Sequence, residues 1–311
     1  MPGHFDQRRG DVIRILRAGQ VDALAAMRPR AKRARRFERL SHARKRLRVD
    51  QRPDQRALRA RIADRHRGVG CDQLLTVEAP RSASAVASYR IWNADGSVAG
   101  QCGNGARCIA AWLVHAGAAP ASGAFAIDSP AGRHEVARDA AGGFVIDMGL
   151  PDFAPEALPM RGWSAPQADY ALEVDGIVLR FGAVSMGNPH AVVEAADLAH
   201  APVDRLGKAL QAHGAFPESV NVGFAEVVAP DHLRLRVYER GAGETLACGS
   251  GACAAVAMLT RQGRLPAGAP VAVDLPGGRL RIQYDPASGH VRMGGPTAFV
   301  FDGTMSGEDQ P

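Results

Sequence analysis

The sequence predicts an α/β protein of two pseudo-symmetric lobes, each a strongly curved, mainly antiparallel sheet wrapped around a central helix. Three observations predict this fold. The chain repeats one pattern at a fixed spacing, short β-branched runs alternate with turn residues, and each repeat contains one Ala-rich helical segment. A lone helix among many strands is buried most completely when the sheet curves around it.

The repeat is clearest around two cysteine motifs, QCGNGARCIAAW and ACGSGACAAVAM, which hold Cys102 and Cys248. Asn93 lies nine residues before the first cysteine, and Glu239 lies nine before the second. An Asp and a Pro follow each cysteine by 26 and 28 residues. So many matched positions predict two copies of one unit.

Both kinds of element follow from local patterns. β-branched and aromatic runs bounded by Gly, Pro or Asp predict strands, as in ASYRIW, FVIDMG, LRLRVY and VAVDL. Ala- and Leu-rich segments predict helices over 106–117 and 252–263, which end at Gly117 and Gly263. The repeat then divides the chain as follows: an atypical basic segment over 1–48, a first lobe over 49–148 completed by 294–311, and a second lobe over 149–293.

Composition indicates the class of protein and its compartment. With 311 residues, 46% hydrophobic and 23% charged, the chain is long enough for two globular domains. No apolar run approaches the roughly 18 residues of a membrane span, and the start has no apolar signal core. Five cysteines are an odd number, which favours free thiols in a reducing cytosol over a disulfide framework. We therefore expect a cytoplasmic protein without a membrane partner.

The charge is uneven along the chain. Residues 1–67 hold 21 Lys or Arg against 7 Asp or Glu. Such an arm could neutralise nucleic-acid phosphates, but it lacks interleaved aromatic residues and a recognisable reading module. We therefore expect no nucleic-acid partner and look for the function in the two repeats.

The paired cysteines indicate acid–base chemistry. The glycines of CGNG and CGSG let backbone N–H groups face a ligand at a helix start, where an anion is stabilised and the pKa of a nearby thiol is lowered. One thiol on each side of a ligand can remove a proton from one face of a stereocentre and return another to the opposite face. A single cysteine is more often a small buried hydrophobic residue, and we assign Cys71, Cys108 and Cys253 to packing.

Other chemistries lack their residues. The sequence has no C-x-x-C pair for thiol exchange and no His/Cys spacing for zinc. Its three lysines lie outside the repeated motifs, so a pyridoxal Schiff base has no suitable host. We expect neither a metal nor a cofactor.

Five motifs together, CGNGARC, MGNPH, SVNVGF, YERGAGETLACGSGACA and GVGCDQ, resemble the diaminopimelate epimerase family from about Ile62 to Gly303. The resemblance implies a cofactor-independent homodimer that converts LL-2,6-diaminopimelate to meso-diaminopimelate, for lysine and peptidoglycan precursors. It also implies a site in the cleft between the lobes, with Cys102 and Cys248 as the acid–base pair.

The resemblance implies roles for further residues. Helix-start residues would cap the substrate's α-carboxylate: Gly103, Asn104, Gly249 and Ser250. Side-chain amides would hold the two ends of the substrate: Gln73, Asn93, Asn188 and Asn221. Glu239 and Arg240 would bracket an ammonium and a carboxylate, since a planar guanidinium suits a carboxylate. His190 either assists proton transfer or is simply a packed, hydrogen-bonded histidine.

Two alternative functions stay open. The chain could be a racemase or epimerase of another amino acid, of the proline or hydroxyproline type, although Glu239 and Arg240 fit an open-chain amino acid better. It could also be a non-catalytic homologue, because one motif of the first lobe is missing. The repeat requires a strand like SMGNPHAVVE (185–194) about thirty residues before Gln73, and the family has Met-His-Gly-x-Gly-Asn-Asp-Phe there. The chain instead reads LSHARKRLRVD over 40–50, without glycine or asparagine.

A reading-frame error is one hypothesis for this departure. With codons chosen for the purpose, His-Ala-Arg-Lys-Arg-Leu-Arg can be written CAT GCA CGG AAA CGA CTT CGC, which read one base later becomes Met-His-Gly-Asn-Asp-Phe. On this hypothesis residues 1–48 are out of frame and the proper frame resumes near Val49. A genuine divergent extension is the alternative, and the nucleotide sequence of the gene distinguishes the two.

Repairing the motif should restore the protein. A buried strand made from SHARKRLR would leave unpaired charges in the interior, at a cost of several kcal/mol each. We expect the chain as written to be less stable and nearly inactive, and its SHARKRLR-to-Gly-Asn-Asp-Phe replacement to gain both stability and turnover. Equal epimerisation rates for the two chains would contradict the frame error.

Overall fold

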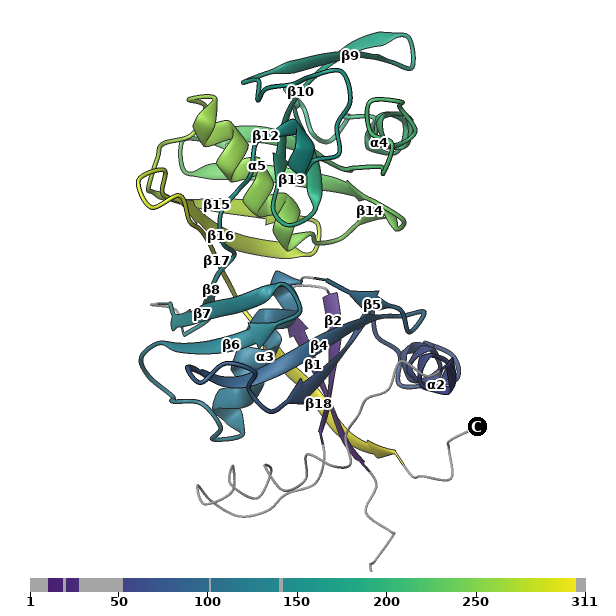
Figure 1. Cartoon of the computed structure of the whole chain (residues 1–311), viewed down its shortest axis with the longest axis vertical. Helices are drawn as coiled ribbons and strands as arrows, with labels where there is room; N and C mark the ends of the chain where they lie inside the picture. Colours follow the sequence, from purple (N-terminus) through teal and green to yellow (C-terminus); the bar gives the residue numbers. More distant parts are fainter. Residues whose placement is uncertain (1–10, 19–20, 28–52, 101, 140–141, 306–311) are drawn as a thin grey trace, which may run out of the picture. The chain divides into compact units, whose positions relative to one another are not determined.

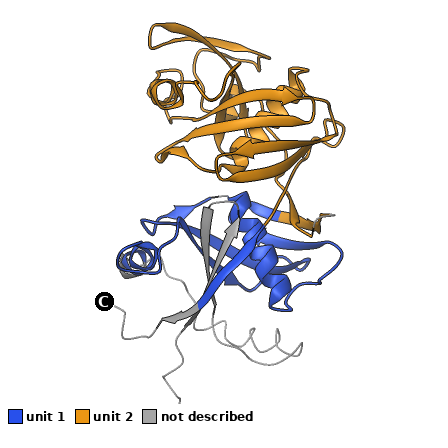
Figure 2. Ribbon diagram, turned by 180° about the vertical axis from the view of Figure 1, so that it is seen from behind, with its two compact units in different colours: residues 1–18, 22–133, 297–311 blue, residues 19–21, 134–296 orange. Residues whose placement is uncertain are grey.

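In the computed structural model, the described residues are 11–18, 21–27, 53–100, 102–139 and 142–305. They form two compact units: one holds the described residues within 1–18, 22–133 and 297–311, the other those within 19–21 and 134–296 (Figure 2). Among the described helices, none combines the length and apolar character needed to span a membrane.

The second unit is a set of paired strands with two α-helices. Its elements in chain order are β7 (Gly132–Arg138, which starts at the boundary), β8 (Phe144–Asp147), the 3-10 helix η2 (Pro155–Ala157), β9 (Tyr170–Val174), β10 (Ile177–Ser185), β11 (Pro189–Glu194), α4 (Val203–Gln211), β12 (Asn221–Ala229), β13 (His232–Glu239), β14 (Gly243–Thr245), α5 (Gly249–Arg261), β15 (Pro270–Leu275), β16 (Gly278–Tyr284) and β17 (Val291–Gly295).

Most of these strand pairs are antiparallel, as predicted. Two pairs are parallel, β11–β12 and β13–β15. The antiparallel pairs are β9–β10, β10–β11, β12–β13, β13–β14, β15–β16, β16–β17, β17–β8 and β7–β8. The parallel pair β13–β15 needs a crossover connection, and α5 supplies it. α5 contacts β10, β11, β12, β16 and β17, so strands from both ends of the unit surround one helix (Figure 1).

Small residues let the strands approach α5 on all sides. The helix GSGACAAVAMLTR is rich in Ala and Gly, and every residue from Gly251 to Thr260 is buried. On β10, a Cβ added to Gly182 would lie 2.2 Å from Cγ of Met258. Glycine is therefore required at this position for β10 to pack against the helix.

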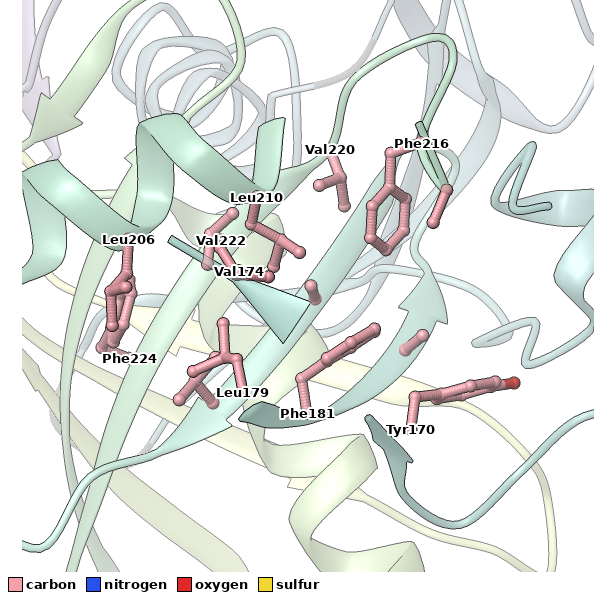
Figure 3. Close-up of a cluster of buried hydrophobic side chains, with 14 of the residues drawn as sticks. Tyr170, Val174, Leu179, Phe181, Leu206, Leu210, Phe216, Val220, Val222 and Phe224 are labelled. Atoms are coloured by element: carbon pink, nitrogen blue, oxygen red, sulfur yellow. The ribbon is translucent and has the colours of Figure 1, made fainter. Parts of the chain in front are cut away.

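A second apolar cluster lies between β9–β12 and α4 (Figure 3). α4 contributes Val203, Leu206 and Leu210, whose spacing places them on one helical face. In the same cluster Phe181 of β10 lies between two rings, with centroids 5.6 Å from Tyr170 and 5.8 Å from Phe216. The helix is thus held by its apolar face rather than by its polar residues.

The first unit repeats this arrangement. Its elements are β1 (Asp11–Ala18), β2 (Val21–Met27), α2 (Pro53–Ala63), β3 (Gln73–Glu78), β4 (Ala85–Asn93), β5 (Val98–Ala99), α3 (Gly103–His115), β6 (Phe125–Ser129) and β18 (Ala298–Met305). β2–β3 and β4–β6 are parallel, matching β11–β12 and β13–β15. β1–β18, β3–β4 and β4–β5 are antiparallel. The predicted repeat of an α/β unit around a central helix is confirmed.

The two registers agree residue by residue. In the first unit Ile91 is opposite Ala99, and in the second Val237 is opposite Thr245. Ser88 is opposite Asp128, as Arg234 is opposite Asp274. Each pair sits at the same distance from its cysteine, so structural equivalence can be assigned by sequence position.

The pairing of the N-terminal strands and the division into compact units bear on the predicted lobes. β1 and β2 belong to the segment 1–48, and β2 runs parallel to β3 with Ala23 opposite Gln73, as β11 runs beside β12 with His190 opposite Asn221. The expected strand over 41–50 lies outside the described residues. Contacts of β8 with β17 also place 134–148 with the second unit rather than the first. The lobe boundaries stay a prediction.

Removing the central ring of the aromatic cluster should destabilise the second unit. We expect Phe181→Ala to lower the free energy of unfolding by about 3–4 kcal/mol, because a large buried side chain leaves a cavity. Val178→Ala is the matched control, since Val178 lies on the same strand and is 70% exposed; its effect should stay within about 0.5 kcal/mol. Urea unfolding followed by circular dichroism measures both, and equal losses would contradict the packing described.

Candidate active site

In the second unit, Cys248 is the N-cap residue of α5. Its backbone is extended, with φ −125° and ψ 104°, and the first intrahelical bond runs from the Ala252 N–H to the Cys248 carbonyl at 3.0 Å. The N–H groups of Gly249 and Ser250 precede that bond and point out of the helix start. A Cβ at Gly251 would lie 3.2 Å from the Cys248 sulfur, so this glycine keeps room for the thiol.

The surroundings of Cys248 favour its protonated form. The side chain is only 5% exposed, and burial raises the pKa of the thiol well above its ordinary value. The carboxylate of Glu239 raises the pKa further, and the Ser250 hydroxyl, 3.7 Å from the sulfur, opposes this only in part. The expectation that the helix start lowers the pKa of both cysteines is therefore wrong for Cys248, because burial and a carboxylate outweigh the helix dipole.

Glu239 is held beside Cys248 by a neighbour that was not among the predicted site residues. The Thr245 hydroxyl donates a hydrogen bond to Oε1 of Glu239. Thr245 ends β14, which pairs with β13 so that Val237 is opposite Thr245. The sequence does contain a signal for it, because Thr245 stands three residues before Cys248 in GETLACGSG.

Three predicted residues form one hydrogen-bonded group next to Cys248. His190 Nε2 lies 3.1 Å from the Ser250 hydroxyl and 3.1 Å from Oδ1 of Asn188, whose amide nitrogen is 3.4 Å from the same hydroxyl. Burial, and next the charge of Arg240, lower the pKa of His190 to about 3. His190 is thus a neutral imidazole at physiological pH, packed as well as hydrogen-bonded to the residue beside Cys248.

Asn221 and Arg240 are joined through the backbone. The Asn221 amide donates to the Pro189 carbonyl at 3.0 Å, and its Oδ1 accepts from the Arg240 N–H at 2.9 Å. The guanidinium of Arg240 donates to the Glu218 carbonyl at 3.0 Å. Asn221 therefore ties the start of β11 to the turn after β13, which places Glu239 and Arg240 near the start of α5.

In the first unit, Cys102 is the N-cap of α3 in the same way. Its sulfur accepts a hydrogen bond from the Gly105 N–H at 3.3 Å, and its carbonyl accepts from the Ala106 N–H at 2.9 Å. Cys102 is half-buried. Burial raises the pKa of Tyr89 on β4, and the charge of nearby Cys102 is the second cause of this increase. Gly103 begins α3, and the next residue, Asn104, is buried with its Oδ1 accepting from Arg107 at 2.9 Å.

The amides predicted for the first unit also come together. Gln73 opens β3 and is directly opposite Asn93, the last residue of β4. The Asn93 amide nitrogen donates to the Ser97 hydroxyl at 3.0 Å. Gln73 and Asn93 therefore lie side by side on neighbouring strands.

The remaining cysteines lie in the core. Cys108 and Cys253 are fully buried on α3 and α5, and Cys71 packs with Leu74 and Trp92. In the part of the chain that the structure describes, no three His, Cys, Asp or Glu side chains are grouped so as to hold a metal ion.

The sequence matches the profile of the family "Diaminopimelate epimerase" over residues 48–154 and 182–299, which together contain every predicted site residue. The chain belongs to this family. It is 59% identical over 251 residues to a diaminopimelate epimerase of Xanthomonas campestris pv. campestris, covering 81% of this chain and 87% of the relative. It is 56% identical over 255 residues to one of Xylella fastidiosa strain M12, covering 82% and 89%.

Solved structures share the fold at low sequence identity. A probable proline racemase from Agrobacterium radiobacter K84 superposes with a TM-score of 0.66 at 14% identity, covering 95% of this chain and 92% of that one. A hydroxyproline epimerase from Agrobacterium vitis, solved with trans-4-hydroxy-L-proline, gives 0.67 at 15%, covering 97% and 94%. These likenesses confirm the predicted two-lobed α/β fold, and the diaminopimelate epimerase family is identified by the sequence match.

The neutral state of His190 makes stability depend on pH. Because the folded protein holds the pKa of His190 near 3, below the unfolded value of about 6.5, its contribution is complete above about pH 6.5 and is lost as pH falls toward 3. Between pH 7 and pH 4.5 the free energy of unfolding should fall in both proteins. We expect the fall to be about 2 kcal/mol smaller in His190→Gln than in the wild type. Urea titrations at both pH values measure this, and parallel losses would show that His190 takes up its proton without cost.

Proposed function

We propose that the chain epimerises LL-2,6-diaminopimelate and meso-diaminopimelate at one α-carbon, using Cys102 and Cys248 as its two acid–base groups. The observation that supports this most is that each cysteine caps a buried helix at the same position of a repeated unit, in a member of the diaminopimelate epimerase family. The reaction belongs to the synthesis of lysine and of peptidoglycan precursors.

The proton balance needs one thiolate and one thiol. One cysteine, as thiolate, removes the α-proton, and the other donates its proton to the opposite face of the carbanion. After one turnover the two have exchanged protonation states, which suits the reverse reaction. Cys248, whose pKa is raised by burial and by Glu239, is the thiol of the resting pair, and the less buried Cys102 is the thiolate.

The helix starts stabilise the charge that develops on the substrate. The N–H groups of Gly103 and Asn104, with those of Gly249 and Ser250, face outward at a positive dipole end, where an α-carboxylate gaining enolate character is stabilised. Amides hold the substrate ends: Gln73, Asn93, Asn188 and Asn221. Glu239 and Arg240 take an ammonium and a carboxylate, and the exposed side of Arg240 favours this role.

Solvent exchange tests the substrate and the reaction together. In D₂O, an epimerase incorporates deuterium at the α-carbon of LL-diaminopimelate and leaves L-proline unlabelled. Label in L-proline alone would replace this function with that of a racemase for cyclic amino acids. Absence of label in either substrate would indicate a non-catalytic homologue.

We further propose that the protein works as a cytoplasmic homodimer. Three consecutive large apolar side chains of β18 are 45–49% exposed: Phe299, Val300 and Phe301. Exposed apolar side chains grouped in this way support association with a second copy. Light scattering coupled to size-exclusion chromatography gives the mass in solution, and a monomer at micromolar concentration would oppose the proposal.

Removing either thiol should abolish epimerisation. We expect Cys102→Ala and Cys248→Ala each to reduce turnover by at least about 10³-fold, because one face of the α-carbon then has no proton carrier. Cys→Ser at either position should retain some one-sided deuterium exchange, since a hydroxyl is a far weaker acid and base. Cys253→Ala, on the same helix and fully buried, is the control; full activity in Cys102→Ala or Cys248→Ala would exclude the two-base mechanism.

A further inference from the structure

Thr245 and Glu239 occupy the same face of the hairpin formed by β13 and β14. Val237 is opposite Thr245, and Glu239 follows Val237 by two residues, so its side chain lies on the same face. That face is directed at the start of α5, because Cγ2 of Val237 lies 3.1 Å from where a Cβ of Gly251 would be. The Thr245 hydroxyl donates to the Glu239 carboxylate on this face, next to Cys248.

The first unit has no hydroxyl at the position of Thr245. In the first unit Ile91 is opposite Ala99, the pair that corresponds to Val237 and Thr245. The residue that corresponds to Glu239 is Asn93, which instead uses Ser97 as its partner. The first unit thus has the neutral amide of Asn93 in place of Glu239 and Ala99 in place of Thr245. The fold itself therefore does not require a hydroxyl at this position.

We propose that Thr245 is a positioning residue for Cys248: its hydroxyl occupies one oxygen of Glu239 and so limits how strongly this carboxylate holds the Cys248 proton. This inference rests on the proposed acid–base role of Cys248. No role of Thr245 in binding substrate is involved.

The physical reason is competition between two donors for one carboxylate. Glu239 acts on Cys248 both through its charge and as an acceptor for the thiol. A carboxylate that already accepts from a hydroxyl is a weaker acceptor for a second donor, whereas one without this partner binds the S–H more tightly. Without the hydroxyl, Cys248 would give up its proton less readily in either direction of the reaction.

Alkylation of the two cysteines tests the proposal without using turnover. Wild type, Thr245→Val and Thr245→Ser are treated with iodoacetamide at pH 8.5, and mass spectrometry follows Cys248 relative to Cys102, which lies in the other unit. Only thiolate reacts, so the ratio reports how tightly Cys248 holds its proton. Thr260→Val is the matched control, because Thr260 lies on α5 and its hydroxyl has no partner among the described residues.

We expect Thr245→Val to slow alkylation of Cys248 by about fivefold or more, and to lower kcat/KM for diaminopimelate by about tenfold. Thr245→Ser, which keeps the hydroxyl, should stay within about twofold of wild type in both, as should Thr260→Val. An unchanged or faster Cys248 reaction in Thr245→Val, or an equal loss in Thr245→Ser, would overturn the proposal.

The result remains decisive if other expectations fail. If Thr245→Val does not fold, as judged by its circular dichroism spectrum, Thr245→Ala removes the same hydroxyl without adding a methyl group. If no variant or wild type epimerises diaminopimelate, the proposed function fails, but the alkylation ratio still shows whether Thr245 controls the Cys248 proton.

Discussion

The structure depends on burying an entire helix inside a curved set of strands. A helix contacted on all sides must be apolar all round and narrow, and α5 meets this with Ala and Gly, while Gly182 of β10 leaves room for Met258. The start of such a helix is where its backbone N–H groups are not used within the helix. Placing a cysteine there puts a thiol, two backbone donors and a helix dipole at one point.

Repeating the unit provides two such points, but identical points would not suffice for the chemistry. Two-base epimerisation needs one thiol and one thiolate at the same time. The units share their strand pairings yet differ around the cysteines. Cys248 is buried beside the Glu239 carboxylate, whereas Cys102 is half-buried, with the neutral Asn93 at the corresponding position. The two units share their strand pairings, and the surroundings of their cysteines differ in burial and in charge.

Sequence reasoning reached the features that depend on local pattern and spacing. The helix starts at Cys102 and Cys248, the repeat, and the grouping of His190, Asn188 and Ser250 all follow from motifs whose positions are readable in one dimension. The raised pKa of Cys248 does not follow from its place at a helix start, because it comes from burial by strands distant in sequence and from the Glu239 carboxylate. Thr245 was missed because its importance comes from a cross-strand neighbour, Glu239, rather than from its own motif.

The first unit keeps a cysteine at its helix start, but its N-terminal strand β2 differs in sequence from the corresponding strand β11 of the second unit. Ala23 is opposite Gln73 where His190 is opposite Asn221, so the position of Asn188 corresponds to Val21, which offers no amide. The match to the family profile begins at residue 48, so it includes Cys102 but not β2. Both observations locate the departure in the same stretch of chain. This departure should therefore weaken substrate binding by the first unit and lower the stability of that unit. Proton transfer at Cys102 should be affected only through the position of the bound substrate.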